Sequence, residues 1–115
     1  MKTGTSVIFD PEEALAIVDG DRNLFSELVA LFRQNYPSEL SSIRDAIRLQ
    51  DWATLETASH QLKGSLSAVA AGDAQESARR LETIGREADH AGAGEVFARM
   101  EQQLQALDAA LAGWR

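Results

Sequence analysis

The chain has 115 residues, of which 44% are hydrophobic, and this suits one compact domain with no room for a second catalytic domain. A formal net charge of −7 argues against nucleic acid and anionic membranes as partners, because both bind clustered Lys and Arg. The sequence contains no Cys, which excludes disulfides, thiolate nucleophiles and cysteine metal clusters.

Targeting signals are not evident in the sequence. No apolar run approaches the roughly 20 residues that span a bilayer, and the first residues, Met-Lys-Thr-Gly-Thr-Ser, lack the apolar stretch of a signal peptide. We therefore expect a cytoplasmic protein that acts through protein partners. The sequence is compatible with a free protein and with a module of a larger sensor kinase, and the initiating Met and the lack of a linker slightly favour a free or trimmed protein.

The first predicted helix runs from Pro11 to about Val18. Asp10 suits the N-cap, Pro11 suits the first helical position, and Gly20 ends the segment.

The second predicted segment opens at Asp21 and carries apolar residues at three- and four-residue spacing, which predicts a helix with a core face. The residues of this predicted core face are Leu24, Phe25, Leu28, Leu31 and Phe32. The pattern resumes in Leu40, Ile43 and Ile47. Tyr36-Pro37 either kinks one long helix or separates two, because Pro removes a backbone hydrogen bond.

Three more apolar stripes follow, separated by the turn signals at 71–73 and 91–94. The third stripe consists of Leu55, Ala58, Leu62, Leu66 and Val69. The fourth consists of Ala74, Ala78, Leu81, Ile84 and Ala88. The last consists of Val96, Phe97, Met100, Leu104, Leu107 and Leu111.

No strand pattern occurs, so the sequence predicts an all-α fold. Four amphipathic segments joined by short connections indicate an antiparallel up-and-down four-helix bundle, with the short N-terminal helix as a lid. We expect a single domain over residues 1–115, with a core over about 10–113 and flexible residues 1–9.

The most informative stretch is the run from Ser59 to Ser65, which contains His60, Lys63 and Gly64 in the middle of a predicted helix. Glycine there costs about 1 kcal/mol relative to alanine. Helical side chains lean toward the N-terminus, so a side chain at position 64 would lie over the imidazole of His60, and glycine leaves it uncovered. Lys63 leans the same way and brings an ammonium to the ring, where it can neutralise a phosphoryl group. On residue types alone, a solvated surface histidine is the more common interpretation, and Gly64 favours a nucleophile.

Hairpin geometry adds a partner for the ring. If the turn is centred near position 71, antiparallel neighbours have numbers that sum to roughly 142, which places Glu82 level with His60. A carboxylate that accepts the Nδ1 proton would hold the Nε2 lone pair outward. The same register puts Gly85 opposite Thr57, where a small residue serves either the approach of a partner or close helix packing.

Arg79 and Arg86 lie near this level and predict a local basic spot, of which we expect no more than one arginine to matter. The residues expected to contact a partner are Gln61, Ser65, Ser67, Arg79, Gly85 and Arg86.

The run His60, Lys63, Gly64 and Ser65 resembles the His-x-x-Lys-Gly-Ser motif of histidine-phosphotransfer (HPt) domains. The resemblance covers roughly residues 10–110, although Ala68 and Ala70 replace the polar residue and glycine that usually follow the motif.

The resemblance implies a monomeric helical bundle in which His60 is phosphorylated, Lys63 contacts the phosphoryl group and Glu82 hydrogen-bonds the ring. It implies a phosphocarrier without kinase or ATPase activity, whose partners are response-regulator receivers and a sensor or hybrid histidine kinase. It also implies that neutral His60 Nε2 attacks the phosphorus of an aspartyl phosphate. We find no acidic cluster for Mg²⁺ and expect no metal or cofactor in this chain, so the receiver should supply the Mg²⁺.

Three other functions were weighed. A histidine kinase core needs a nucleotide-binding domain, which does not fit in 115 residues. An adaptor that docks without carrying phosphate would not need His60, Lys63 and Gly64 together. A metal site that uses both histidines fails because His90 should lie on the order of 12 Å along the helix from the level of His60. We expect His90 to interact with the C-terminal end of its helix instead.

Overall fold

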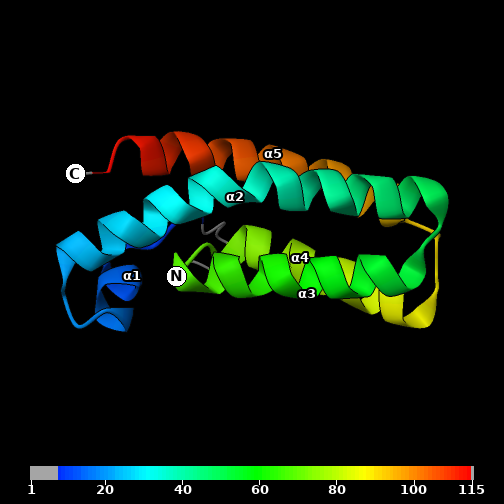
Figure 1. Ribbon diagram of the computed structural model, residues 1–115, viewed down its shortest axis with the longest axis horizontal. Helices are drawn as coiled ribbons and strands as arrows, with labels where there is room; N and C mark the ends of the chain where they lie inside the picture. Colours follow the sequence, from blue (N-terminus) through cyan, green and yellow to red (C-terminus); the bar gives the residue numbers. More distant parts are fainter. Residues whose placement is uncertain (1–7, 115) are drawn as a thin grey trace, which may run out of the picture.

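The computed structural model describes residues 8–114, which form five α-helices and no strand (Figure 1). The helices are α1 (Pro11–Ile17), α2 (Arg22–Leu49), α3 (Trp52–Ala68), α4 (Gly72–Glu87) and α5 (Ala93–Ala112). The all-α prediction is confirmed. The expected flexibility of residues 1–9 falls mostly on residues 1–7, which lie outside the described part of the chain.

The four long helices form two layers, with α3 and α4 as one antiparallel pair and α2 and α5 as the other (Figure 1). Short connections at 50–51, 69–71 and 88–92 join successive helices, so the bundle runs up and down as predicted. Within residues 8–114, no helix has the length and apolarity that crossing a membrane requires.

Three helices begin at an aspartate, because its side chain accepts a hydrogen bond from an otherwise unpaired amide of the first turn. Asp10 accepts from the Glu13 amide and Asp21 from the Leu24 amide. Asp51 starts α3, the helix of His60, and accepts from both the amide and the hydroxyl of Thr54.

Pro37 lies inside α2, which continues as one helix of 28 residues. Figure 1 shows α2 changing direction near its middle. Because proline lacks the N–H that would complete the helical ladder, the structure supports the kink rather than two separate helices.

Most of the predicted apolar residues form one core between the two layers. Phe25, Phe32, Leu55, Leu62 and the other inward residues are less than a tenth exposed. The prediction was wrong for Leu24 and Leu31, which are 42% and 54% exposed. They lie about 100° around the helix from Phe25 and Phe32, at the edge of the buried stripe, where packing covers them only in part.

Two residues near the end of α4 also differ from the sequence interpretation. Ala88, assigned to the fourth stripe, is an exposed C-cap with a positive φ of 52°, so it ends the helix instead of packing in the core. His90 lies beyond α4, and its ring stacks on Trp52 with the centroids 6.2 Å apart. This aromatic contact was not predicted from the sequence, and the interaction of His90 with the end of the helix stays a prediction.

Candidate functional site

His60 lies on the outer side of α3 because the inward positions of that helix are taken by Leu55, Ala58, Leu62 and Leu66. Its side chain is 66% exposed. A histidine in this position is accessible to another protein, whereas the helix backbone on which it stands is anchored by a fully buried apolar stripe.

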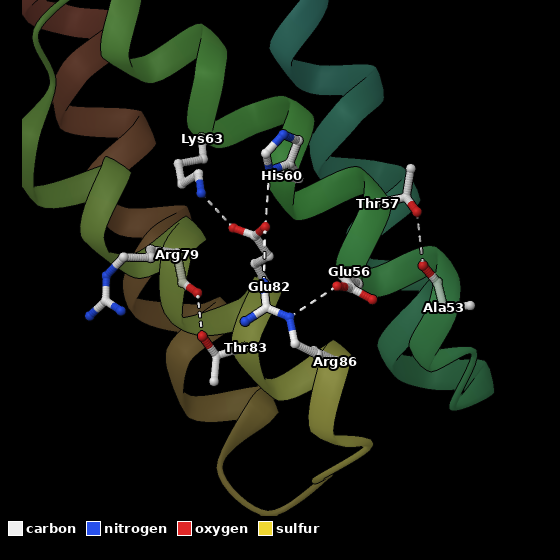
Figure 2. Close-up of polar contacts among 9 residues, drawn as sticks. All are labelled: Ala53, Glu56, Thr57, His60, Lys63, Arg79, Glu82, Thr83 and Arg86. Atoms are coloured by element: carbon white, nitrogen blue, oxygen red, sulfur yellow. Dashed lines mark hydrogen bonds and ion pairs between the residues drawn. The ribbon is translucent and has the colours of Figure 1, made fainter.

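Glu82 of α4 supports the ring from below. Its Oε2 lies 2.9 Å from Nδ1 of His60, while the residue as a whole is only 7% exposed. Figure 2 shows the carboxylate rising from α4 toward the ring, with the second ring nitrogen on the far side from Glu82. The hairpin register predicted from the sequence therefore brings these two side chains together.

Lys63 completes the arrangement from the same helix as His60. Its Nζ donates a hydrogen bond of 2.7 Å to Oε1 of Glu82, so the two oxygens of one carboxylate hold the ring and the ammonium separately. The hydrogen bond from Lys63 lowers the pKa of Glu82 below its ordinary value, and the contact with His60 acts in the same direction against the opposing effect of burial. Glu82 is therefore a carboxylate at neutral pH.

Arg86 adds a second cation to Glu82, which it reaches from one turn further along α4. Its Nη2 lies 3.3 Å from Oε2 of Glu82, and its Nε donates a hydrogen bond of 3.1 Å to Glu56 of α3 (Figure 2). Glu56 was not among the site residues predicted from the sequence, although the hairpin register that pairs positions 60 and 82 also pairs positions 56 and 86. The result is a polar chain from Glu56 through Arg86 and Glu82 to His60.

Arg79 takes no part in this network. It pairs with Glu76 on its own helix, which raises the pKa of Arg79 and lowers that of Glu76. Figure 2 shows the guanidinium directed away from His60. Of the two arginines expected to form a basic spot, the structure brings only Arg86 into contact with the Glu82 carboxylate that holds the ring.

Gly64 and Gly85 have opposite surroundings. A Cβ built on Gly64 would meet no atom within 4 Å, so nothing in the described fold requires a glycine there. A Cβ on Gly85 would lie 2.6 Å from the backbone nitrogen of Glu56 and 2.9 Å from the carbonyl oxygen of Trp52. Gly85 is buried in the contact between α3 and α4, which supports the packing alternative over contact with a partner.

The remaining predicted partner residues lie on or beside the exposed side of α3. Gln61 and Ser67 are exposed, and the Ser65 hydroxyl donates to the Gln61 carbonyl. Within residues 8–114, no group of three His, Cys, Asp or Glu side chains is placed to hold a metal ion.

The sequence matches the family model of the Hpt domain over residues 27–110. The fold is similar to the crystal structure of histidine-containing phosphotransfer protein B (HptB) from Pseudomonas aeruginosa PAO1, with a TM-score of 0.83 over 90% of each chain and 18% sequence identity. That likeness concerns the fold alone. Among curated proteins, none matches the sequence.

Proposed function

Because the chain belongs to the Hpt domain family, which serves histidine phosphotransfer in two-component systems, we propose that it carries a phosphoryl group on Nε2 of His60. It accepts this group from the aspartyl phosphate of a receiver or hybrid sensor kinase and passes it to the receiver aspartate of a response regulator.

The observation that carries the proposal is the division of roles between the two ring nitrogens. Nδ1 of His60 lies 2.9 Å from the buried carboxylate of Glu82, whereas the His60 side chain as a whole is 66% exposed. A carboxylate at Nδ1 favours the tautomer with the proton on that nitrogen, and the lone pair is then on Nε2. Nε2 is thus the nucleophile, and it faces a partner.

The transfer step requires no proton to leave the ring. Nε2 of neutral His60 forms a bond to phosphorus while the bond from phosphorus to the aspartyl oxygen breaks, and the aspartate departs as a carboxylate. The ring, with its proton still on Nδ1, becomes a cation that Glu82 stabilises across the 2.9 Å contact. Return of the electron pair to the ring in the reverse step gives the group to the next receiver.

Lys63 can pair with two anions in turn, the Glu82 carboxylate and the phosphoryl group. In the free protein its ammonium is bound to Glu82, and after transfer the phosphoryl oxygens offer a second and more highly charged acceptor. A lysine can respond because its ammonium is a compact charge on a flexible stem. As Lys63 turns to the phosphoryl group, the Glu82 charge becomes available to the cationic ring.

The chain acts as half of an active site. Transfer of a phosphoryl group between histidine and aspartate depends mainly on positioning and charge stabilisation, and the Mg²⁺ for this transfer comes from the receiver. The protein functions as a cytoplasmic monomer that binds no cofactor and has no kinase or ATPase activity of its own.

The test is phosphoryl transfer from a ³²P-labelled receiver domain. Wild-type protein becomes labelled with acid-labile phosphate, and His60→Ala does not, although both have the same helical circular dichroism. EDTA added before mixing stops the transfer, whereas EDTA added afterwards leaves the labelled histidine intact. Label that persists in His60→Ala would refute the site, and binding to receivers without labelling would indicate an adaptor.

A further inference from the structure

A groove between α2 and α3 adjoins the proposed phosphorylation site. It has a volume of about 490 Å³ and is lined mainly by small polar side chains, among them Ser38 and Ser42 of α2 and Thr54 of α3. Thr57 and Gln61 line both this groove and the hollow that contains His60 and Glu82, so the two depressions are adjacent. Figure 2 shows Thr57 on the opposite side of α3 from Lys63.

Glu39 is the one charged residue among those that line the groove in the described part of the chain. Its Oε1 is buried and has no hydrogen-bond partner within residues 8–114. Burial raises the pKa of this carboxyl, and no cation or hydrogen-bond donor counteracts the effect there. Oε1 of Glu39 is therefore desolvated without a hydrogen-bond donor in the described residues, in contrast to the carboxylate of Glu82, which has three donors.

An unpaired buried acceptor is costly, by about 1 to 3 kcal/mol, and a fold gains nothing from it. The remainder of the Glu39 residue is partly exposed, and within residues 8–114 no donor makes a hydrogen bond to the buried oxygen that would hold the side chain in place. A donor that enters the groove can therefore draw the carboxylate outward without breaking an existing interaction.

We propose that Glu39 is a docking residue, which receives a basic side chain of the receiver domain when the receiver aspartate is placed over His60. The inference rests on the proposed phosphotransfer function and extends it to the choice of partner.

The size and polarity of the groove suit a basic side chain. Its volume accommodates an extended Lys or Arg side chain, and its serine and threonine hydroxyls supply acceptors beside the single carboxylate. Of the charged groups on α3 nearest to it, Glu56 is already paired with Arg86, which leaves Glu39 as the attracting charge. Because the groove adjoins the hollow of His60 at Thr57 and Gln61, a protein seated over the histidine lies beside the groove as well.

The experiment loads the protein on histidine with phosphoramidate, which requires no partner, and follows transfer to a panel of receiver domains with Mg²⁺. For the receiver with the highest kcat/KM, Glu39→Gln raises KM about tenfold, the effect of losing a charge-assisted hydrogen bond, and leaves kcat nearly unchanged. The increase in KM diminishes at high salt, where the wild-type ion pair is screened. Glu27→Gln provides the matched control, since Glu27 is an exposed residue of the same helix outside the groove, and its KM equals that of the wild type.

The outcomes distinguish the docking role from the phosphotransfer function. An unchanged KM in Glu39→Gln, with normal loading and transfer by the wild type, overturns the docking role and leaves the phosphotransfer function standing. A rise in KM that is the same at low and high salt overturns the basic partner and indicates a neutral donor. Both proposals are overturned if the wild type does not load on His60, or if it loads but transfers the phosphoryl group to none of the receivers. Thermal unfolding of Glu39→Gln and Glu39→Ala separates a docking effect from a loss of fold.

Discussion

Replacement of Glu82 by Gln tests the charge at the site most directly. The amide keeps an oxygen that accepts the Nδ1 proton of His60, but it removes the negative charge that faces the phosphorylated ring. Because Glu82 also binds Lys63 and Arg86, the change leaves two cations beside a third that forms on phosphorylation. Glu82→Gln should therefore transfer phosphate more slowly, while the bundle stays folded.

The magnitude follows from the contacts. Opposite charges about 4 Å apart attract each other by about 4 kcal/mol at an effective dielectric of about 20. In the phosphorylated state Lys63 has turned to the phosphoryl group and Arg86 still pairs with Glu82, while the ring is 66% exposed, so solvent screens much of the attraction between the ring and the carboxylate. A third of the attraction, about 1.4 kcal/mol, corresponds to a tenfold slower step, since each 1.36 kcal/mol changes a rate tenfold.

The assay is rapid-quench measurement of transfer from a phosphorylated receiver to excess Hpt protein, so that the chemical step is observed in one turnover. Glu76→Gln is the control, because this change also removes a carboxylate that pairs with an arginine of α4, at a position without contact to His60. We expect the control to transfer at the wild-type rate. Glu82→Ala, which loses both the charge and the acceptor, should be slower than Glu82→Gln.

Two results would refute the reasoning. Equal rates for the wild type and Glu82→Gln would mean that hydrogen bonding, rather than charge, is the contribution of Glu82. Equal rates for Gln and Ala at this position would mean that the acceptor is dispensable and that the 2.9 Å contact with Nδ1 does not orient the ring.

Four further predictions concern stability and access. Gly85→Ala should lower the free energy of unfolding by about 2 to 3 kcal/mol in urea titrations, because the added Cβ would lie 2.6 Å from the Glu56 nitrogen; an unaffected midpoint would contradict this packing. Gly64→Ala should stabilise the helix by up to about 1 kcal/mol, whereas the longer Gly64→Gln should slow transfer by leaning over the ring; equal rates would contradict the access role. Because the pKa of Glu82 is lowered on folding, its charge stabilises the protein above its unfolded pKa of about 4.3, and this contribution is lost as the pH falls through the folded value. The difference in thermal stability between wild type and Glu82→Gln should therefore shrink on acidification, and a constant difference would contradict the assignment. Burial raises the pKa of Glu39, so its charge destabilises the folded state at neutral pH, the opposite of the effect of Glu82. Glu39→Gln should therefore be at least as stable as the wild type at pH 7 and lose that advantage in acid. A destabilised variant at pH 7 would show that Glu39 supports the fold.

The sequence specifies the α3–α4 hairpin more fully than the rest of the protein. The antiparallel register follows from the position of one turn, and it places Glu82 at the level of His60 without reference to side-chain contacts. The caps at Asp10, Asp21 and Asp51 follow from local hydrogen bonding within three residues.

The features that the sequence left undetermined depend on neighbouring helices. Leu24 and Leu31 have the spacing of core residues, but the width of the arc that is covered depends on where α5 and α1 lie against α2. The pairing of Arg79 with Glu76, three residues away on the same helix, competes with any distant anion, and composition alone does not rank the two. Glu39 gave no signal, because desolvation of one exposed-face glutamate depends on the packing of α2 against α3.

Glu82 and Glu39 are proposed to act in different ways, Glu82 in the transfer step and Glu39 in the binding of the receiver. Glu82 is held by donors from α3 and α4, so the residues that we propose this chain contributes to transfer are already assembled within one hairpin. Glu39 stands on α2, outside that network, with a buried oxygen that the described structure leaves unpaired. Substitutions on the α2 side of the groove should therefore alter the preference among receivers while the rate of the bound complex is preserved. Substitutions in the hairpin network should instead slow transfer to every receiver by a similar factor, because all of them meet the same charged ring.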